Sequence, residues 1–228
     1  MHYSLDSVLP FIRQTAGPRT IIIPILNIYG TGARVQKELP DCTVLDGCIY
    51  VSASLEHPGV LVQHGPILRV VFGHRDPSYI SPILSAIQSD LCESGIAGVL
   101  STHIQRDALE KFSYVSPIGA AGVYLHAVAG DFQKEGPARE LFKSMIREIS
   151  ALTAAMGYLF EKDYVKLTLE ILSNLSADAT TARQRDIMEG KPSELDGLVM
   201  EPLRLAKKYS VSMPCYEEVA KVLCPLEF

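Results

Sequence analysis

The periodicity of the apolar residues changes near residue 104, and this change constrains the fold more than any other feature of the sequence. Before it, the β-branched run TIIIPIL (residues 20–26) indicates a buried strand, and SPILSAIQSDLCESG (81–95) indicates a helix that ends at Gly95. Residues 43–73 lie between them and are rich in Val, Ile and Tyr. The first part of the chain is therefore predicted to be α/β.

The stretch 43–73 contains two dipeptides that favour turns, Pro58-Gly59 and Gly65-Pro66. Breaking the apolar run at these points predicts three strands joined by turns. The shorter stretches SLDSVLPFIRQ (4–14) and GARVQKEL (32–39) are predicted to be helices.

After residue 104 the apolar residues recur at helical spacing. One stripe, expected to face a core, consists of Leu141, Met145, Ile146, Ile149, Leu152 and Met156. Pro214 fits the first position of a last helix, and Pro202 is expected to kink a helix or to mark its start. The sequence thus predicts α/β followed by all-α, with domains at residues 1–103 and 104–228.

Composition excludes several classes of function. The formal net charge is -5 and no basic patch dominates, so nucleic acid is not an expected partner. The apolar run at residues 20–30 is about half the length that spans a bilayer, so no membrane partner is expected. The N-terminal residues do not form a signal peptide. We therefore expect a cytoplasmic protein with reduced thiols.

No metal site is predicted. The five cysteines include no C-x-x-C pair, and the histidines, among them His57 and His64, do not have the spacing of metal ligands. Packing and surface positions account for both residue types.

A glycine turn follows the first predicted strand. Gly30-Thr31-Gly32 resembles the start of a dinucleotide-binding G-x-G-x-x-G loop, but the third glycine is replaced by Val35. A turn between a strand and a helix explains both glycines, and this interpretation is favoured over a phosphate site.

Lys111 and Glu194 each have a structural and a functional interpretation. Lys111 lies at the charged start of an apolar helix, where it either extends to solvent or holds an ammonium at a cleft. Glu194 lies in DIMEGKPSELDG (186–197), directly after a predicted break between two helices. It either offsets the helix N-terminus or faces a ligand. Ser193 already fits the cap position, which favours the second role.

The sequence resembles the ketopantoate reductase (2-dehydropantoate 2-reductase) family over nearly its whole length. The segment TARQRDIMEGKPSELDGLVMEPLRLAKKYSVSMP is similar to the C-terminal signature of the family, and IQRDALEKF is similar to the helix start that carries its lysine. IIIPILNIYGTGARVQKELP and DGCIYVSASLEHPGVLVQHG resemble two earlier segments, in the same order. The resemblance implies a Rossmann-like sheet followed by a helical domain for substrate binding and dimerisation.

The resemblance also implies roles for particular residues. Lys111 corresponds to the general acid that protonates the substrate ketone, and Glu194 to a glutamate that contacts bound ligand. Asn27 and the backbone of Ala53 correspond to positions beside NADPH. The implied reaction is the NADPH-dependent reduction of a 2-keto acid to a 2-hydroxy acid, as in pantothenate biosynthesis, by an enzyme that could form a homodimer.

The substrate side departs from the family pattern. Asp186 corresponds to a substrate-side aspartate. A serine of the family that binds the substrate carboxylate would fall at Ala182, and its neighbour Thr181 is the substrate-binding candidate here. Two asparagines of the family would fall at Val115 and Gly119. A further asparagine would fall near Ala129. The resemblance therefore leaves the identity of the 2-keto acid open.

The family's cofactor loop, G-x-G-x-x-G, does not occur in this chain. Without it the pyrophosphate has no helix N-terminus to bind, so we expect weak NADPH binding and impaired catalysis. The alternative is a non-catalytic module, derived from the family, that binds a ligand or dimerises.

Overall fold

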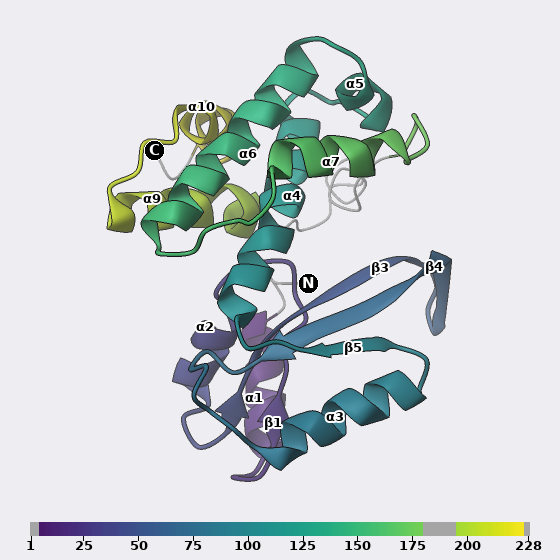
Figure 1. The fold of residues 1–228 in the computed structure, drawn as a ribbon, viewed down its shortest axis with the longest axis vertical. Helices are drawn as coiled ribbons and strands as arrows, with labels where there is room; N and C mark the ends of the chain where they lie inside the picture. Colours follow the sequence, from purple (N-terminus) through teal and green to yellow (C-terminus); the bar gives the residue numbers. More distant parts are fainter. Residues whose placement is uncertain (1–4, 180–194, 226–228) are drawn as a thin grey trace. The chain divides into compact units, whose positions relative to one another are not determined.

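The fold was analysed in a computed structural model that describes residues 5–179 and 195–225. Its contacts divide the chain into two compact units. One spans Asp6–Ala108, and the other spans Leu109–Phe228 with Met1–Leu5. The first is α/β and the second is helical (Figure 1), which confirms the predicted fold class. The domain boundary at residues 103/104 stays a prediction.

The α/β unit contains a parallel pair of strands and a three-stranded sheet. In the pair, β1 (Ile21–Ile22) lies beside β2 (Thr43–Val44), with Ile22 opposite Val44. The sheet has the order β3-β4-β5. Its strands are β3 (Asp46–His57), β4 (Val60–Gly73) and β5 (Ala97–Leu100), of which β4 pairs antiparallel with β3 and parallel with β5.

Three helices accompany these strands. They are α1 (Leu5–Thr15), α2 (Thr31–Glu38) and α3 (Pro82–Glu93). Helix α3 packs against β5 (Figure 1), and its Leu84 joins a core made with Leu45, Val70 and Phe72. Gly95 follows α3 with a φ of 81°, the left-handed conformation that ends many helices, as the sequence predicted.

Two of the strand predictions needed correction. The run at residues 20–26 forms a strand only at Ile21–Ile22, because Pro24 has no N–H to donate to a ladder. Gly65-Pro66 does not end a strand. Val51 pairs with Leu68 and Ala53 with Gln63, so residues 64–67 of β4 lie opposite Ser52 alone. The dipeptide therefore forms a bulge within β4.

The helical unit is built around α6 (Pro137–Ala155). Helix α6 packs against α5 (Ala129–Gln133), α7 (Tyr164–Ser173), α9 (Glu201–Tyr209) and α10 (Pro214–Leu223). Its buried residues are Phe142, Met145, Ile146, Ile149, Leu152 and Thr153. The predicted stripe was thus right at its centre, whereas Leu141 and Met156 at its ends are only partly buried.

Helix α4 (Ile104–Tyr124) spans the division between the units. A π-helical turn (η2, Asp196–Met200) precedes α9, so Pro202 lies at the start of α9, as one of the two predicted alternatives had it. Pro214 occupies the first turn of α10. In the part of the chain that the structure describes, no helix is long and apolar enough to cross a membrane.

Candidate functional site

The loop that carries Asn27 follows β1 and leads into α2. We call residues 23–30 the Asn27 loop. At its start, the backbone N–H of Leu45 donates to the Ile22 carbonyl oxygen over 2.9 Å. A Cβ added to Gly47 would lie 2.8 Å from the Ile23 Cγ2, so the loop begins in close contact with β3. Asn27 itself is half-buried.

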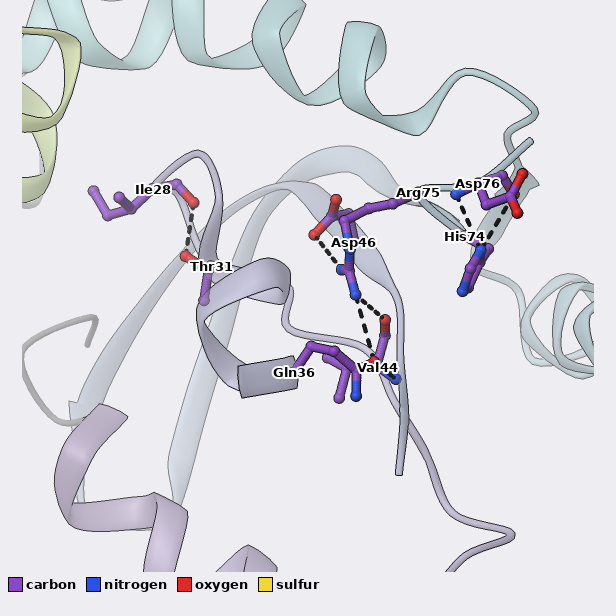
Figure 2. Close-up of polar contacts among 8 residues, drawn as sticks. All are labelled: Ile28, Thr31, Gln36, Val44, Asp46, His74, Arg75 and Asp76. Carbon is purple, nitrogen blue, oxygen red and sulfur yellow. Dashed lines mark hydrogen bonds and ion pairs between the residues drawn. The ribbon is translucent and has the colours of Figure 1, made fainter. Parts of the chain in front are cut away.

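The loop ends in the glycine turn that the sequence pointed to. Gly30 has a φ of 79°, which favours glycine, and its carbonyl oxygen accepts from the backbone N–H of Arg34 over 3.1 Å. The Thr31 hydroxyl donates to the carbonyl oxygen of Ile28 over 2.7 Å (Figure 2). These bonds join the loop to the first turn of α2.

A carboxylate occupies the N-terminus of α2. Asp46, the first residue of β3, accepts a hydrogen bond from the backbone N–H of Gly32. A Cβ on Gly32 would overlap the Asp46 Oδ1 and the Leu45 carbonyl oxygen. Glycine is thus required here for the close approach of the carboxylate.

Arg75 joins Asp46 to the neighbouring elements (Figure 2). Its Nη1 lies 3.1 Å from Asp46 Oδ1, and its Nη2 donates to the Val44 carbonyl oxygen over 2.8 Å. A longer contact of 3.5 Å reaches Gln36 Oε1, which also accepts from the Val44 N–H over 3.0 Å. The side chains of Arg75 and Asp46 are only 19% and 13% exposed. The pair is therefore largely removed from water.

Burial is the main influence on the Asp46 carboxyl group. It raises the pKa of Asp46 above its ordinary value, although the Arg75 charge and hydrogen bond act in the opposite direction. His74 and the Gly32 N–H also favour the ionised form. The ion pair thus compensates only in part for the desolvation of the carboxylate.

His74 and Asp76 flank Arg75 on an exposed turn. The Asp76 backbone N–H lies 3.1 Å from His74 Nδ1, and the His74 ring stacks on Tyr79 with centroids 4.2 Å apart (Figure 2 shows His74 and Asp76). Hydrogen bonds from Ser78 lower the pKa of the Asp76 carboxyl group. These contacts hold the turn that carries Arg75.

Ala53 lies in β3, half-buried, next to the bulge in β4. Beside it, Ser54 Oγ and His64 Nε2 are 2.8 Å apart, a contact between β3 and the bulge. Asn27 and Ala53 both belong to the α/β unit.

Lys111 belongs to the helical unit. It lies in the second turn of α4 and is half-buried. Val115 and Gly119 follow at intervals of four residues, on the same side of the helix. The other assigned residues, Glu194, Asp186 and Thr181, lie outside the described residues, as does Ala182. The cleft role of Lys111 and the ligand role of Glu194 therefore stay predictions.

Sequence reasoning missed a buried polar chain that anchors the turn after Glu194. The Ser116 hydroxyl on α4 donates to the Leu198 carbonyl oxygen over 2.6 Å, and Ser116 Oγ lies 2.5 Å from the Tyr216 hydroxyl on α10. Pro202 cannot give Leu198 the N–H that an α-helix would supply four residues on. Pro202 was the signal in the sequence, but it did not identify the replacement donor.

The start of α10 is also capped from a distance. The Glu148 carboxylate on α6 accepts the backbone N–H groups of Cys215 over 2.8 Å and Tyr216 over 3.1 Å. Burial, followed by the hydrogen bond to Glu148, raises the pKa of the Cys215 thiol to about 11. Among the described residues, no three His, Cys, Asp or Glu side chains are grouped as metal ligands.

Two sequence models of one protein family match this chain. The model described as ketopantoate reductase PanE/ApbA C terminal matches residues 103–227, and the model for ketopantoate reductase PanE/ApbA matches residues 2–77. The first alone covers more than half of the chain. The chain belongs to the ketopantoate reductase PanE/ApbA family.

Known proteins agree with this assignment. The 2-dehydropantoate 2-reductase of Aquifex aeolicus is 23% identical over 225 residues, which cover 97% of this chain and 72% of the relative. The crystal structure of the 2-dehydropantoate 2-reductase from Geobacter metallireducens superposes with a TM-score of 0.89 at 18% identity, over 98% of this chain and 74% of that one.

A solved enzyme that is named for a different substrate has the same fold. D-mandelate dehydrogenase in complex with NADH superposes with a TM-score of 0.84 at 17% identity, over 99% of this chain and 76% of that one. The ternary structure of D-mandelate dehydrogenase with NADH and anilino(oxo)acetate superposes with a TM-score of 0.83 at 18% identity, over 96% of this chain and 71% of that one. At these identities the structural likeness shows the fold alone.

Proposed function

We propose that this protein reduces a 2-keto acid to a 2-hydroxy acid with NADPH as the hydride donor. The observation that carries the proposal is the match of residues 103–227 to the C-terminal domain of the family, with Lys111 half-buried in the first long helix of that match. The names of the relatives support a 2-keto acid as the class of substrate.

Lys111 is the proposed general acid. Its ammonium donates a proton to the carbonyl oxygen of the substrate as negative charge develops there. The hydride for the keto carbon would come from NADPH when it is bound. Glu194 faces the ligand and favours the charged form of Lys111, while Asp186 and Thr181 orient the substrate.

The cofactor side of the proposal rests on the α/β unit. The side-chain amide of Asn27 and the backbone at Ala53 would hold NADPH. Asp46 places a carboxylate beside the first turn of α2, and this carboxylate would disfavour a pyrophosphate there. We therefore expect an affinity in the high micromolar range or weaker, because charge-assisted bonds of roughly 1.5–3 kcal/mol each are missing.

The face of α4 that carries Lys111 favours an apolar substrate. Val115 and Gly119 offer no side-chain amide on the side of α4 that carries Lys111. A substrate hydroxyl buried against Val115 and Gly119 would gain no hydrogen bond from these two side chains, at a cost of about 1–3 kcal/mol. An apolar or aromatic 2-keto acid avoids this cost, which places phenylglyoxylate ahead of ketopantoate.

A turnover assay tests the proposal. Loss of NADPH absorbance is followed at millimolar NADPH with phenylglyoxylate, ketopantoate and pyruvate. The wild type should turn over, and Lys111→Ala should lower the rate by about 10²–10⁴-fold, the range for a general acid. Lys162→Ala removes an exposed lysine of the same unit and should leave the rate unchanged. Equal rates in the two variants would reject Lys111 as the acid.

The same assay separates the alternative. A wild-type chain that binds these acids in calorimetry, yet shows no turnover at any NADPH concentration, would be a ligand-binding module and not a reductase.

A further inference from the structure

Both ends of the Asn27 loop are fastened to one short segment, Val44–Gly47. At the start of the loop, the Leu45 N–H donates to the Ile22 carbonyl oxygen, and Gly47 lets Ile23 approach closely. At its end, the Asp46 carboxylate accepts from the Gly32 N–H. The position of Asn27 therefore depends on how firmly this segment is held.

Arg75 is the residue that holds the segment from the other side. Its guanidinium donates to the carboxylate of Asp46 and to the carbonyl of Val44, over 3.1 and 2.8 Å. Gln36 completes the arrangement, because its amide donates to the Leu39 and Cys42 carbonyl oxygens over 3.1 and 2.9 Å. The rigid fork of arginine suits these simultaneous bonds, which a lysine ammonium makes less well.

We propose that Asp46 and Arg75 are positioning residues, which hold the Asn27 loop in the shape that presents Asn27 to the cofactor. Neither side chain touches the cofactor in this scheme. Asp46 acts through the Gly32 N–H and Arg75 acts through Asp46 and Val44. The inference rests on the proposed function, in which Asn27 contacts NADPH.

Amide exchange by NMR tests whether the pair holds the loop. Asp46→Ala and Arg75→Met should raise the rate of amide exchange at residues 28–32 by about 10-fold or more. In the wild type, local opening of the loop must break the hydrogen bonds of Asp46 and Arg75, and in these variants it need not. Asp46→Asn keeps an acceptor oxygen for Gly32 and should rescue most of the protection. Arg75→Lys keeps the charge without the two-pronged geometry and should rescue only part of it. Arg13→Met removes an exposed ion pair with Glu38 of α2 and is the matched control.

Binding of NADPH to the same labelled protein tests the functional part. In the wild type, NADPH should shift the side-chain amide signal of Asn27. The shift should be lost in Asp46→Ala and Arg75→Met and kept in Asp46→Asn, with the signals of α10 unchanged as a check on folding.

The outcomes separate the two proposals. Unchanged loop exchange in both Asp46→Ala and Arg75→Met overturns the positioning role, and so does an Asn27 shift that survives in both. If NADPH does not shift the Asn27 signal of the wild type, the proposed contact of Asn27 with NADPH is wrong, and the pair has no role in cofactor binding. The exchange data still decide whether Asp46 and Arg75 hold the loop.

Discussion

The hydroxyl of Tyr216 lies 2.5 Å from Ser116 Oγ, and Ser116 in turn donates to the carbonyl oxygen of Leu198. Because the Ser116 proton is committed to Leu198, the Tyr216 hydroxyl acts as the donor to Ser116. Burial raises the pKa of Tyr216 far above its ordinary value, so the hydroxyl keeps this proton at neutral pH. Three helical segments, α4, η2 and α10, are thus joined by one buried chain of hydrogen bonds.

Ser116→Ala should therefore destabilise the protein more than Tyr216→Phe. The first leaves both the Leu198 carbonyl and the Tyr216 hydroxyl without their partner, at about 1–3 kcal/mol for each buried group. The second removes a donor and leaves Ser116 bonded to Leu198. Urea unfolding of the two single variants and the double variant measures the coupling, which should reach about 1 kcal/mol for groups in one network. Strict additivity would show that the hydroxyls do not form a chain.

Gly32→Ala should be one of the most damaging glycine substitutions in the α/β unit. Its Cβ would overlap the Asp46 carboxylate and the Leu45 backbone, which cannot both move aside. We expect a loss of about 3 kcal/mol or more in the free energy of unfolding. Gly17→Ala is the control, since Gly17 has open space around it and no positive φ. A similar thermal midpoint for both variants would contradict the contact between Gly32 and Asp46.

The cysteines should differ in their reactivity toward iodoacetamide at neutral pH. Cys215, with a pKa raised to about 11 by burial and by Glu148, has about 100-fold less thiolate than an ordinary cysteine. Cys92 is exposed and should be modified first. Mass spectrometry of timed samples gives the order. Glu148→Gln should speed the labelling of Cys215, because it removes the neighbouring charge that raises the thiol pKa.

The sequence predicted those elements whose signals are local. Pro214 marks the start of α10 and Gly95 the end of α3, since each acts through its own backbone. The length of β1 was overestimated, because the apolar run TIIIPIL outweighed the missing N–H of Pro24. Residues 64–67 were read as containing a turn, although a bulge uses the same residue types.

The contacts that shape the candidate site are not local. Asp46 and Arg75 are 29 residues apart, and Ser116 and Tyr216 are 100 residues apart. No periodicity or spacing rule pairs such residues, because their meeting depends on the register of β3 with β4 or on the packing of α4 with α10. The resemblance to the family supplied Lys111, Asn27 and Ala53 as candidates, and it carried no information on Asp46 or Tyr216.

The pH dependence of stability should reveal the buried carboxyl group of Asp46. Burial raises the pKa of Asp46 in the folded state, whereas the unfolded chain ionises near the ordinary value of 3.8. The folded state thus binds the proton of Asp46 more tightly than the unfolded chain does. The stability that this proton binding contributes is fully present below pH 3.8 and is lost as the pH rises through the raised pKa. Asp46→Asn has no such titration, while Arg75 and His74 are common to both proteins. The free energy of unfolding of the wild type minus that of Asp46→Asn should therefore fall between acid and neutral pH in urea titrations. A difference that rises with pH would mean that the attraction of Arg75 outweighs the desolvation of the carboxylate.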